Sequence, residues 1–211
     1  NYTTIKNCSI FQGRANAANS YGIYFTNGYN LSIENNSLSM QGVTNANSNN
    51  FGIYLNNQKV SKISNNNITS SGRAAYPIYI YTKSNSTNVS FNMISTSAAY
   101  TNGIYTYSAD ENAIHMNNIS TTGANSNSIN IYYSIRNNIT SNNVSNTGNT
   151  AAAVYVRGDL GTANSNRIEE NFLQTRGTNS YPVYLYLQVM SNIIRNNTLN
   201  SYGTGAGIYL Q

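Results

Sequence analysis

A short phrase recurs eight times along this chain: in most copies a small residue, then a branched apolar residue, then a tyrosine. Two of the copies are Gly52-Ile53-Tyr54 and Gly207-Ile208-Tyr209. The tyrosines that end the phrase are Tyr24, Tyr54, Tyr79, Tyr105, Tyr132, Tyr155, Tyr184 and Tyr209. They follow one another at intervals of 23 to 30 residues, about 26 on average. A repeat of roughly 20 to 50 residues is typical of a solenoid, whose repeats bury their apolar faces against each other.

A second phrase keeps step with the first and reads apolar-x-x-Asn-x-apolar, as in the segment from Ile33 to Leu38. Its asparagines are Asn36, Asn66, Asn92, Asn117, Asn142, Asn171 and Asn197. An eighth copy, from Ile5 to Ile10, carries Cys8 in the asparagine position. Each repeat therefore holds two strand-like pieces separated by two spacers.

The apolar runs are short, β-branched and bounded by Asn, Gly and Ser, which favours strands over helices. Ile53-Tyr54-Leu55 alternates, so its tyrosine faces away from its apolar neighbours. Equivalent strands of successive repeats then pair in parallel, and such crossovers are nearly always right-handed. The sequence predicts an all-β fold: one right-handed parallel β-helix of about eight coils over residues 1–211, or a segment of a longer β-helix.

These two phrases resemble the right-handed parallel β-helix repeat family, the pectate-lyase-like superfamily, in its surface or structural type. The resemblance covers nearly the whole chain, from Ile5 to Leu210. It implies the fold rather than one activity, since this superfamily includes lyases, hydrolases, phage spikes and inert surface proteins.

The asparagine column has a physical reason. Stacking places each asparagine about 4.8 Å above the previous one, where its amide can donate to one neighbour and accept from another. Asparagine also tolerates the left-handed backbone of a tight turn. We assign these seven residues to a structural ladder, and Cys8 to its first position as an inert substitute rather than a nucleophile.

Acidic residues are too few and too scattered to predict catalysis. The outward column beside the ladder places Glu34 next to Lys6 and Glu169 next to Arg195, which predicts exposed ion pairs. His115 has no carboxylate beside it in this column. We therefore predict no catalytic residue, no cofactor and no metal site. A remnant of a polysaccharide lyase or hydrolase remains the enzymatic alternative.

The outward tyrosine column is not required for stacking, because any strand-forming residue would serve there. A partial second row follows two residues later, at Tyr81, Tyr107 and Tyr186. The combined strip predicts either a self-association surface or a polysaccharide-binding surface, since tyrosine is enriched at interfaces and its ring can stack on a sugar. A purely structural reading, in which tyrosine simply favours strands, is the third alternative.

Composition narrows the possible partners. The net charge of +5 comes from scattered basic residues, which argues against nucleic acid. No apolar run reaches the length of a membrane span. Abundant Asn, Ser, Thr and Tyr with only 8% charged residues favour an extracellular or cell-surface location. Tyr209 would precede Tyr24 of a following copy by one repeat length, so we also expect head-to-tail homo-oligomers or filaments.

Overall fold

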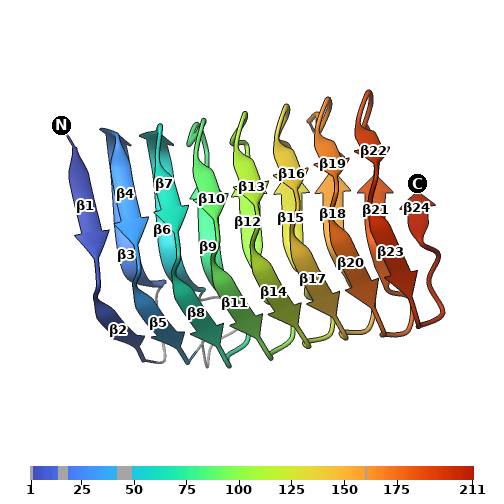
Figure 1. The fold of residues 1–211 in the computed structure, drawn as a ribbon, viewed down its shortest axis with the longest axis horizontal. Helices are drawn as coiled ribbons and strands as arrows, with labels where there is room; N and C mark the ends of the chain where they lie inside the picture. The colour runs from blue at the N-terminus through green and yellow to red at the C-terminus, as the bar shows by residue number, and fades with distance from the viewer. Residues whose placement is uncertain (1, 14–18, 42–48, 160) are drawn as a thin grey trace.

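The computed structural model describes residues 2–13, 19–41, 49–159 and 161–211. The regular structure in those ranges is β-strand, and its 24 strands form three parallel sheets of eight. The chain passes through the sheets in turn, so three successive strands make one coil, and the eight coils lie side by side from the N-terminus to the C-terminus (Figure 1). The predicted parallel β-solenoid of about eight coils is confirmed.

Each sheet takes one strand from every coil. The first sheet contains β1 (Thr3–Lys6), β4 (Leu31–Glu34), β7 (Lys62–Ser64), β10 (Asn88–Ser90), β13 (Ala113–His115), β16 (Asn138–Thr140), β19 (Arg167–Glu169) and β22 (Ile193–Arg195). The second contains β2 (Ser9–Gln12), β5 (Ser37–Met40), β8 (Asn67–Ser70), β11 (Met93–Thr96), β14 (Asn118–Thr121), β17 (Asn143–Asn146), β20 (Phe172–Thr175) and β23 (Thr198–Ser201). The third contains β3 (Ser20–Tyr29), β6 (Asn50–Lys59), β9 (Ala75–Tyr81), β12 (Ile104–Tyr107), β15 (Ile129–Tyr132), β18 (Ala152–Arg157), β21 (Tyr181–Tyr186) and β24 (Ile208–Leu210).

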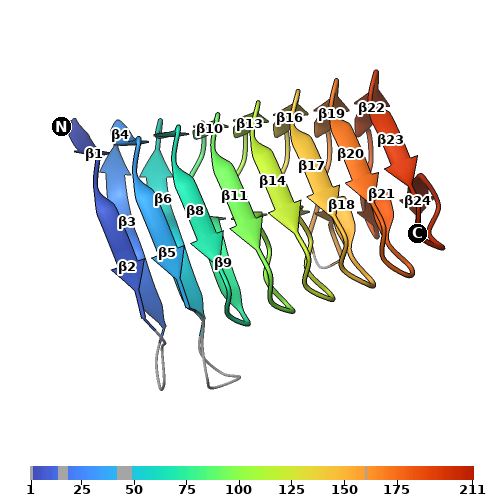
Figure 2. The same cartoon turned by 60° about the horizontal axis from the view of Figure 1, so that its bottom comes forward.

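The asparagine phrase makes two strands rather than the single strand-like piece predicted. In the second coil, Ile33 ends up in β4 and Leu38 in β5, with Asn36 at the corner between them. Asn35, just before it, has a φ of 56°, in the left-handed region that asparagine tolerates better than most residues. We call this corner between the first and second sheets, where the chain turns from β4 into β5, the first corner (Figure 2). Both apolar residues beside it are buried.

The buried apolar side chains form one continuous cluster along the solenoid. Ile33, Ile63 and Val89 pair in register on successive coils, and all three are fully buried. Burying one such side chain contributes roughly 1.5–3 kcal/mol. The stacking of like residues on like therefore stabilises every coil against the next.

The predicted asparagine ladder is present in the structure. The backbone N–H and the side-chain amide of Asn92 both donate to Oδ1 of Asn117, at 3.0 Å, and Asn117 makes the same pair of bonds to Asn142. Cys8 stands at the first position, where its backbone N–H donates to Asn36 Oδ1 at 3.0 Å. The ladder satisfies backbone groups at the first corner that water cannot reach.

A second ladder was not predicted. Asn112, Asn137 and Asn166 are fully buried at the start of first-sheet strands, and each donates its backbone N–H to Oδ1 of the next ladder member at 2.8–2.9 Å. Asn192 is the last acceptor of the series. Ladders of buried amides therefore stabilise two corners of the described coils: the first corner and the corner where the chain enters the first sheet.

Candidate functional site on the third sheet

The outer surface of the third sheet gathers most of the tyrosine in the chain. Fifteen of the 19 tyrosines lie on its strands. Its strands contain only two charged residues, Lys59 and Arg157, whereas the outward charges Lys62, Glu169 and Arg195 lie on first-sheet strands. We call the outer surface of the third sheet the tyrosine face.

Strand register sorts the tyrosine face into rows. Row one reads Tyr24, Tyr54, Tyr79, Tyr105, Asn130, Tyr155, Tyr184, Tyr209. Row two, two residues further along each strand, reads Thr26, Asn56, Tyr81, Tyr107, Tyr132, Arg157, Tyr186. A third row, three residues before row one, begins with Tyr21, Phe51 and Tyr76 and includes Ala152 and Tyr181 near its other end.

One predicted position is wrong. Tyr132 was placed in row one, but it pairs with Tyr107 and lies in row two, while Asn130 pairs with Tyr105 and takes the row-one position. The tyrosine still faces outward, because a shift of two residues keeps a side chain on the same face of a strand. Both Ile129 and Ile131 are buried, so apolar alternation fits either placement.

The rings of row one pack on one another. The ring centroids of Tyr24 and Tyr54 are 5.4 Å apart at an interplanar angle of 14°, and those of Tyr79 and Tyr105 are 4.9 Å apart. Burial raises the pKa of Tyr155 to about 12, and it raises the pKa values of Tyr79 and Tyr105 above the ordinary value. These hydroxyls therefore stay protonated at physiological pH, and their part of the tyrosine face is uncharged.

Asn130 interrupts this packing. It is 8% exposed, and its Oδ1 has no hydrogen-bond partner among the residues that the structure describes. On the described part of the tyrosine face, ring contacts divide into one group ending at Tyr132 and Tyr133 and a second group running from Tyr155 to Tyr209. The interruption leaves Tyr155 without an aromatic neighbour on the preceding coil in row one.

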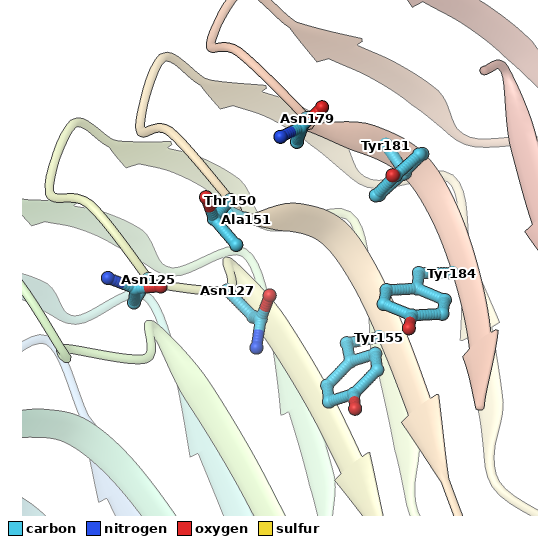
Figure 3. Close-up of a pocket in the computed structure, with 8 residues that line it drawn as sticks. All are labelled: Asn125, Asn127, Thr150, Ala151, Tyr155, Asn179, Tyr181 and Tyr184. Carbon is cyan, nitrogen blue, oxygen red and sulfur yellow. The ribbon is translucent and has the colours of Figure 1, made fainter. Parts of the chain in front are cut away.

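A pocket of about 250 Å³ lies beside this interruption (Figure 3). Its lining consists of aromatic rings on one side and amide or small side chains on the other: Tyr155, Tyr181, Tyr184, Asn125, Asn127, Thr150, Ala151 and Asn179. Asn127 Oδ1 accepts a hydrogen bond from the Ala152 backbone N–H at 2.8 Å. The lining contains no charged side chain, so the pocket fits an apolar or neutral polar group.

Arg157 lies in row two between two rings. Its guanidinium is 4.9 Å from the Tyr132 ring centroid and 5.4 Å from that of Tyr186, which are cation–π distances. It also forms an ion pair with Asp159, with Nε 2.9 Å from Oδ2. Hydrogen bonds from Arg157 and from the Tyr133 hydroxyl lower the pKa of Asp159 to about 2. The pair adds no net charge to the tyrosine face.

The other ionisable residues singled out from the sequence form contacts on the outer side of the first sheet, although Glu169 is buried rather than exposed as predicted. Glu169 pairs with Arg195 at 3.0 Å, as predicted, and also with Arg167. Glu34 lies opposite Lys6 in the sheet, but its ion pair is with Lys62 at 3.2 Å. This partner was missed because Lys62 comes from the neighbouring strand on the other side, two positions out of register, where it lies opposite Ser32.

Three further observations bear on chemistry. His115 contacts Asn88 Oδ1 through Nε2 at 2.9 Å. Within the described ranges, no three His, Cys, Asp or Glu side chains are grouped so that they could hold a metal ion. Nor do those ranges contain a helix long and apolar enough to cross a membrane.

Comparison with known proteins gives one distant similarity. No family model matches this chain, and no curated protein matches it. Among solved structures, it is similar to the Dettilon tailspike protein gp208, with a TM-score of 0.43 and 10% sequence identity. The similarity covers 98% of this chain and 61% of the tailspike chain, so this chain spans less than two thirds of that protein's length. A likeness at this level carries no argument about function.

Proposed function

We propose that this chain is an extracellular structural β-solenoid that self-associates through the tyrosine face. The observation that carries the proposal is the separation of residue types: 15 of 19 tyrosines on one sheet, whose strands contain only two charged residues. Exposed aromatic strips of this kind on a soluble protein mark association surfaces.

The size of the tyrosine face fits this role. Eight strands spaced at about 4.8 Å and six residues at about 3.3 Å give a face of roughly 38 Å by 20 Å, or about 760 Å². A stable interface takes about 800 Å² from each partner. One tyrosine face therefore provides most of the area that one partner needs.

Ring packing favours a protein partner over an extended glycan. A sugar ring stacks on the open face of an aromatic ring, but the Tyr24 and Tyr54 rings lie nearly parallel against each other. Tyr54 and Tyr79 also pack at 5.3 Å, edge to face. What such rings present outward is edges and hydroxyls, which suit contact with another protein surface.

A charge placed on the tyrosine face tests the proposal. Tyr107→Lys puts an ammonium group in row two on the fourth coil, and Ser39→Lys puts the same charge on the exposed outer face of the second sheet, on the second coil. We expect Tyr107→Lys to weaken self-association at least tenfold in sedimentation velocity, with Ser39→Lys and Tyr107→Phe close to the wild type. A wild-type chain that stays monomeric at high concentration, or equal effects of both lysines, would refute the proposal.

Binding of a neutral saccharide is the second candidate, and the pocket beside Asn130 supports it. There the Tyr155 ring lacks a row-one aromatic neighbour on one side, and Asn127 provides an amide. Affinity electrophoresis in gels containing neutral polysaccharides tests it, with Tyr155→Ala against Tyr24→Ala, a row-one tyrosine outside the pocket. Retention that Tyr155→Ala alone abolishes, from a chain that remains monomeric, would favour this candidate over self-association.

A further inference from the structure

The first corner uses one left-handed residue in every coil. Their φ values lie between 54° and 58°, at Asn7, Asn35, Asn65, Phe91, Met116, Ser141, Glu170 and Asn196. Asparagine is favoured in this conformation and bulky side chains are not. Half of the positions hold asparagine, so Phe91 and Met116 are exceptions that the turn itself does not require.

These two exceptions are also exposed. Phe91 is 53% exposed and Met116 is 50% exposed, on the fourth and fifth coils, about 4.8 Å apart along the solenoid. Met93, two residues after Phe91, is 56% exposed on the outer face of β11. We call these three residues the apolar knob. The Phe91 ring packs edge to face on the His115 ring, with centroids 5.8 Å apart, but no member of the knob fills the core, so neither backbone preference nor core packing accounts for them.

The knob lies across the core from the tyrosine face. Each coil has three sides, and the corner between its first two sides is opposite the third. Residues of the fifth, sixth and seventh coils line the pocket beside Asn130, among them Asn127, Tyr155 and Tyr184. The pocket therefore lies close to the level of the knob along the solenoid axis. Both features are departures from the repeat: Asn gives way to Phe and Met at the corner, and Tyr gives way to Asn in row one.

The pocket fits one side chain of the knob in size and chemistry. A cavity of roughly 150 Å³ can hold a benzene ring, and the pocket measures about 250 Å³. A methionine sulfur makes favourable contacts with aromatic rings, and three tyrosines line the pocket. No charged side chain belongs to the knob or lines the pocket, so neither surface loses a charge's hydration on contact.

We propose that the apolar knob of one copy inserts into the pocket beside Asn130 on the tyrosine face of the next copy. The proposal rests on the self-association proposed above and names the surface that the tyrosine face binds. Because knob and pocket lie on opposite sides of one chain, each copy binds one neighbour through its knob and another through its pocket. Such a heterologous contact builds side-by-side rows rather than closed dimers.

Knob variants can be made without weakening the fold. Phe91→Asn with Met116→Asn removes two of the three side chains of the knob, leaves Met93, and restores at both corners the residue that this backbone prefers. Ser141→Asn makes the same backbone improvement one coil later without removing an apolar group. We expect all three substitutions to raise the melting temperature. Only the double variant should weaken self-association, by at least tenfold in sedimentation velocity.

Pocket variants use the same logic. Thr150 is an exposed pocket residue with a φ of 52°, so Thr150→Lys adds a charge at the rim, and Thr150→Asn changes the same position without one. We expect Thr150→Lys to weaken self-association and Thr150→Asn to leave it unchanged.

Mixing the two kinds of variant distinguishes this knob-to-pocket contact from a symmetric contact between two copies. The Phe91→Asn/Met116→Asn chain keeps its pocket, and the Thr150→Lys chain keeps its knob. An equimolar mixture should therefore form one-to-one heterodimers and nothing larger, although each variant alone is monomeric. If the wild type associates and the knob and pocket variants associate as strongly as the wild type, this inference is overturned but the proposed function is not. A mixture of the two variants that forms no heterodimer would have the same consequence. A monomeric wild type would overturn the proposed function as well.

Discussion

Tyr105 and Tyr155 occupy the same row of the third sheet two coils apart, and Asn130 lies between them in register. Asn130 in row one and Arg157 in row two separate two groups of packed rings, and a pocket lined by Tyr155 lies at their boundary. A repeat protein gains stability from like residues stacking on like. At Asn130 the tyrosine face therefore lacks the stacking of like rings, and a pocket lies beside this break in row one.

Replacing Asn130 by tyrosine should complete row one. The new ring would pack between Tyr105 and Tyr155 and would remove a buried amide oxygen that has no partner among the described residues. An aromatic pair contributes about 0.5–1.5 kcal/mol beyond its area, so we expect Asn130→Tyr to raise the free energy of unfolding by about 1 kcal/mol. Urea denaturation measures it. Asn56→Tyr, which adds a ring in row two beside Tyr81 alone, should gain less, and a loss of stability in Asn130→Tyr would contradict the expectation.

The fold was predictable because its two signals are local and repeated. The spacing of the Ile-Tyr phrase gives the coil, and alternation within Ile53-Tyr54-Leu55 gives the inward and outward faces. The ladder from Asn36 to Asn197 follows from the same register. The second ladder was harder to see, because Asn112 and Asn137 precede their strands with no fixed apolar pattern around them.

The details of the site depended on register to within two residues, which alternation alone does not give. The intervals from Tyr105 to Tyr132 and from Tyr132 to Tyr155 are 27 and 23 residues. With Asn130 in row one instead of Tyr132, both intervals are 25 residues. That inequality was the available signal. The pocket was not predictable, since it depends on how the rings of Tyr155 and Tyr181 lie in space.

Removing one rung of the asparagine ladder should destabilise the solenoid strongly. Asn117 Oδ1 accepts two hydrogen bonds from Asn92, and its amide donates to Val89 O at 2.9 Å. Because Asn117→Ala leaves buried donors and an acceptor unpaired, we expect a loss of about 3 kcal/mol in urea denaturation. The adjacent Asn118 is exposed on β14, so Asn118→Ala should change stability by less than about 0.5 kcal/mol. Equal losses in the two variants would show that the ladder does not carry this stability.

The tyrosine face should delay alkaline titration. Burial raises the pKa of Tyr155 from an ordinary 10.0 to about 12, so the folded state holds this proton more tightly than the unfolded state. The resulting stabilisation is complete below pH 10 and is lost as the pH rises towards about 12. Phenolate absorbance should therefore show a late group of tyrosines, and this group should lose one member in Tyr155→Phe. Titration of every tyrosine near pH 10 in the folded protein would contradict the prediction.

Acid should weaken the first sheet through Glu169. Burial of this carboxyl opposes its ionisation, but hydrogen bonds from Arg195 and Arg167 outweigh burial and lower its pKa below the ordinary 4.5. A lowered folded pKa means that the stabilisation is complete above about pH 4.5 and is lost as the pH falls through the folded value. Glu169→Gln should therefore reduce the fall in melting temperature between about pH 6 and about pH 3.

Part of that acid sensitivity should remain in Glu169→Gln, because hydrogen bonds from Ser32 and Lys62 lower the pKa of Glu34 as well. Arg195→Gln provides the matched variant: it keeps the carboxyl but removes one of its two cationic partners. The pKa of Glu169 should then move back towards its ordinary value, and the fall in melting temperature should begin at a higher pH than in the wild type. If Arg195→Gln and wild type lose stability over the same pH range, the ion pair does not set the ionisation of Glu169, and the acid dependence must come from elsewhere on the solenoid.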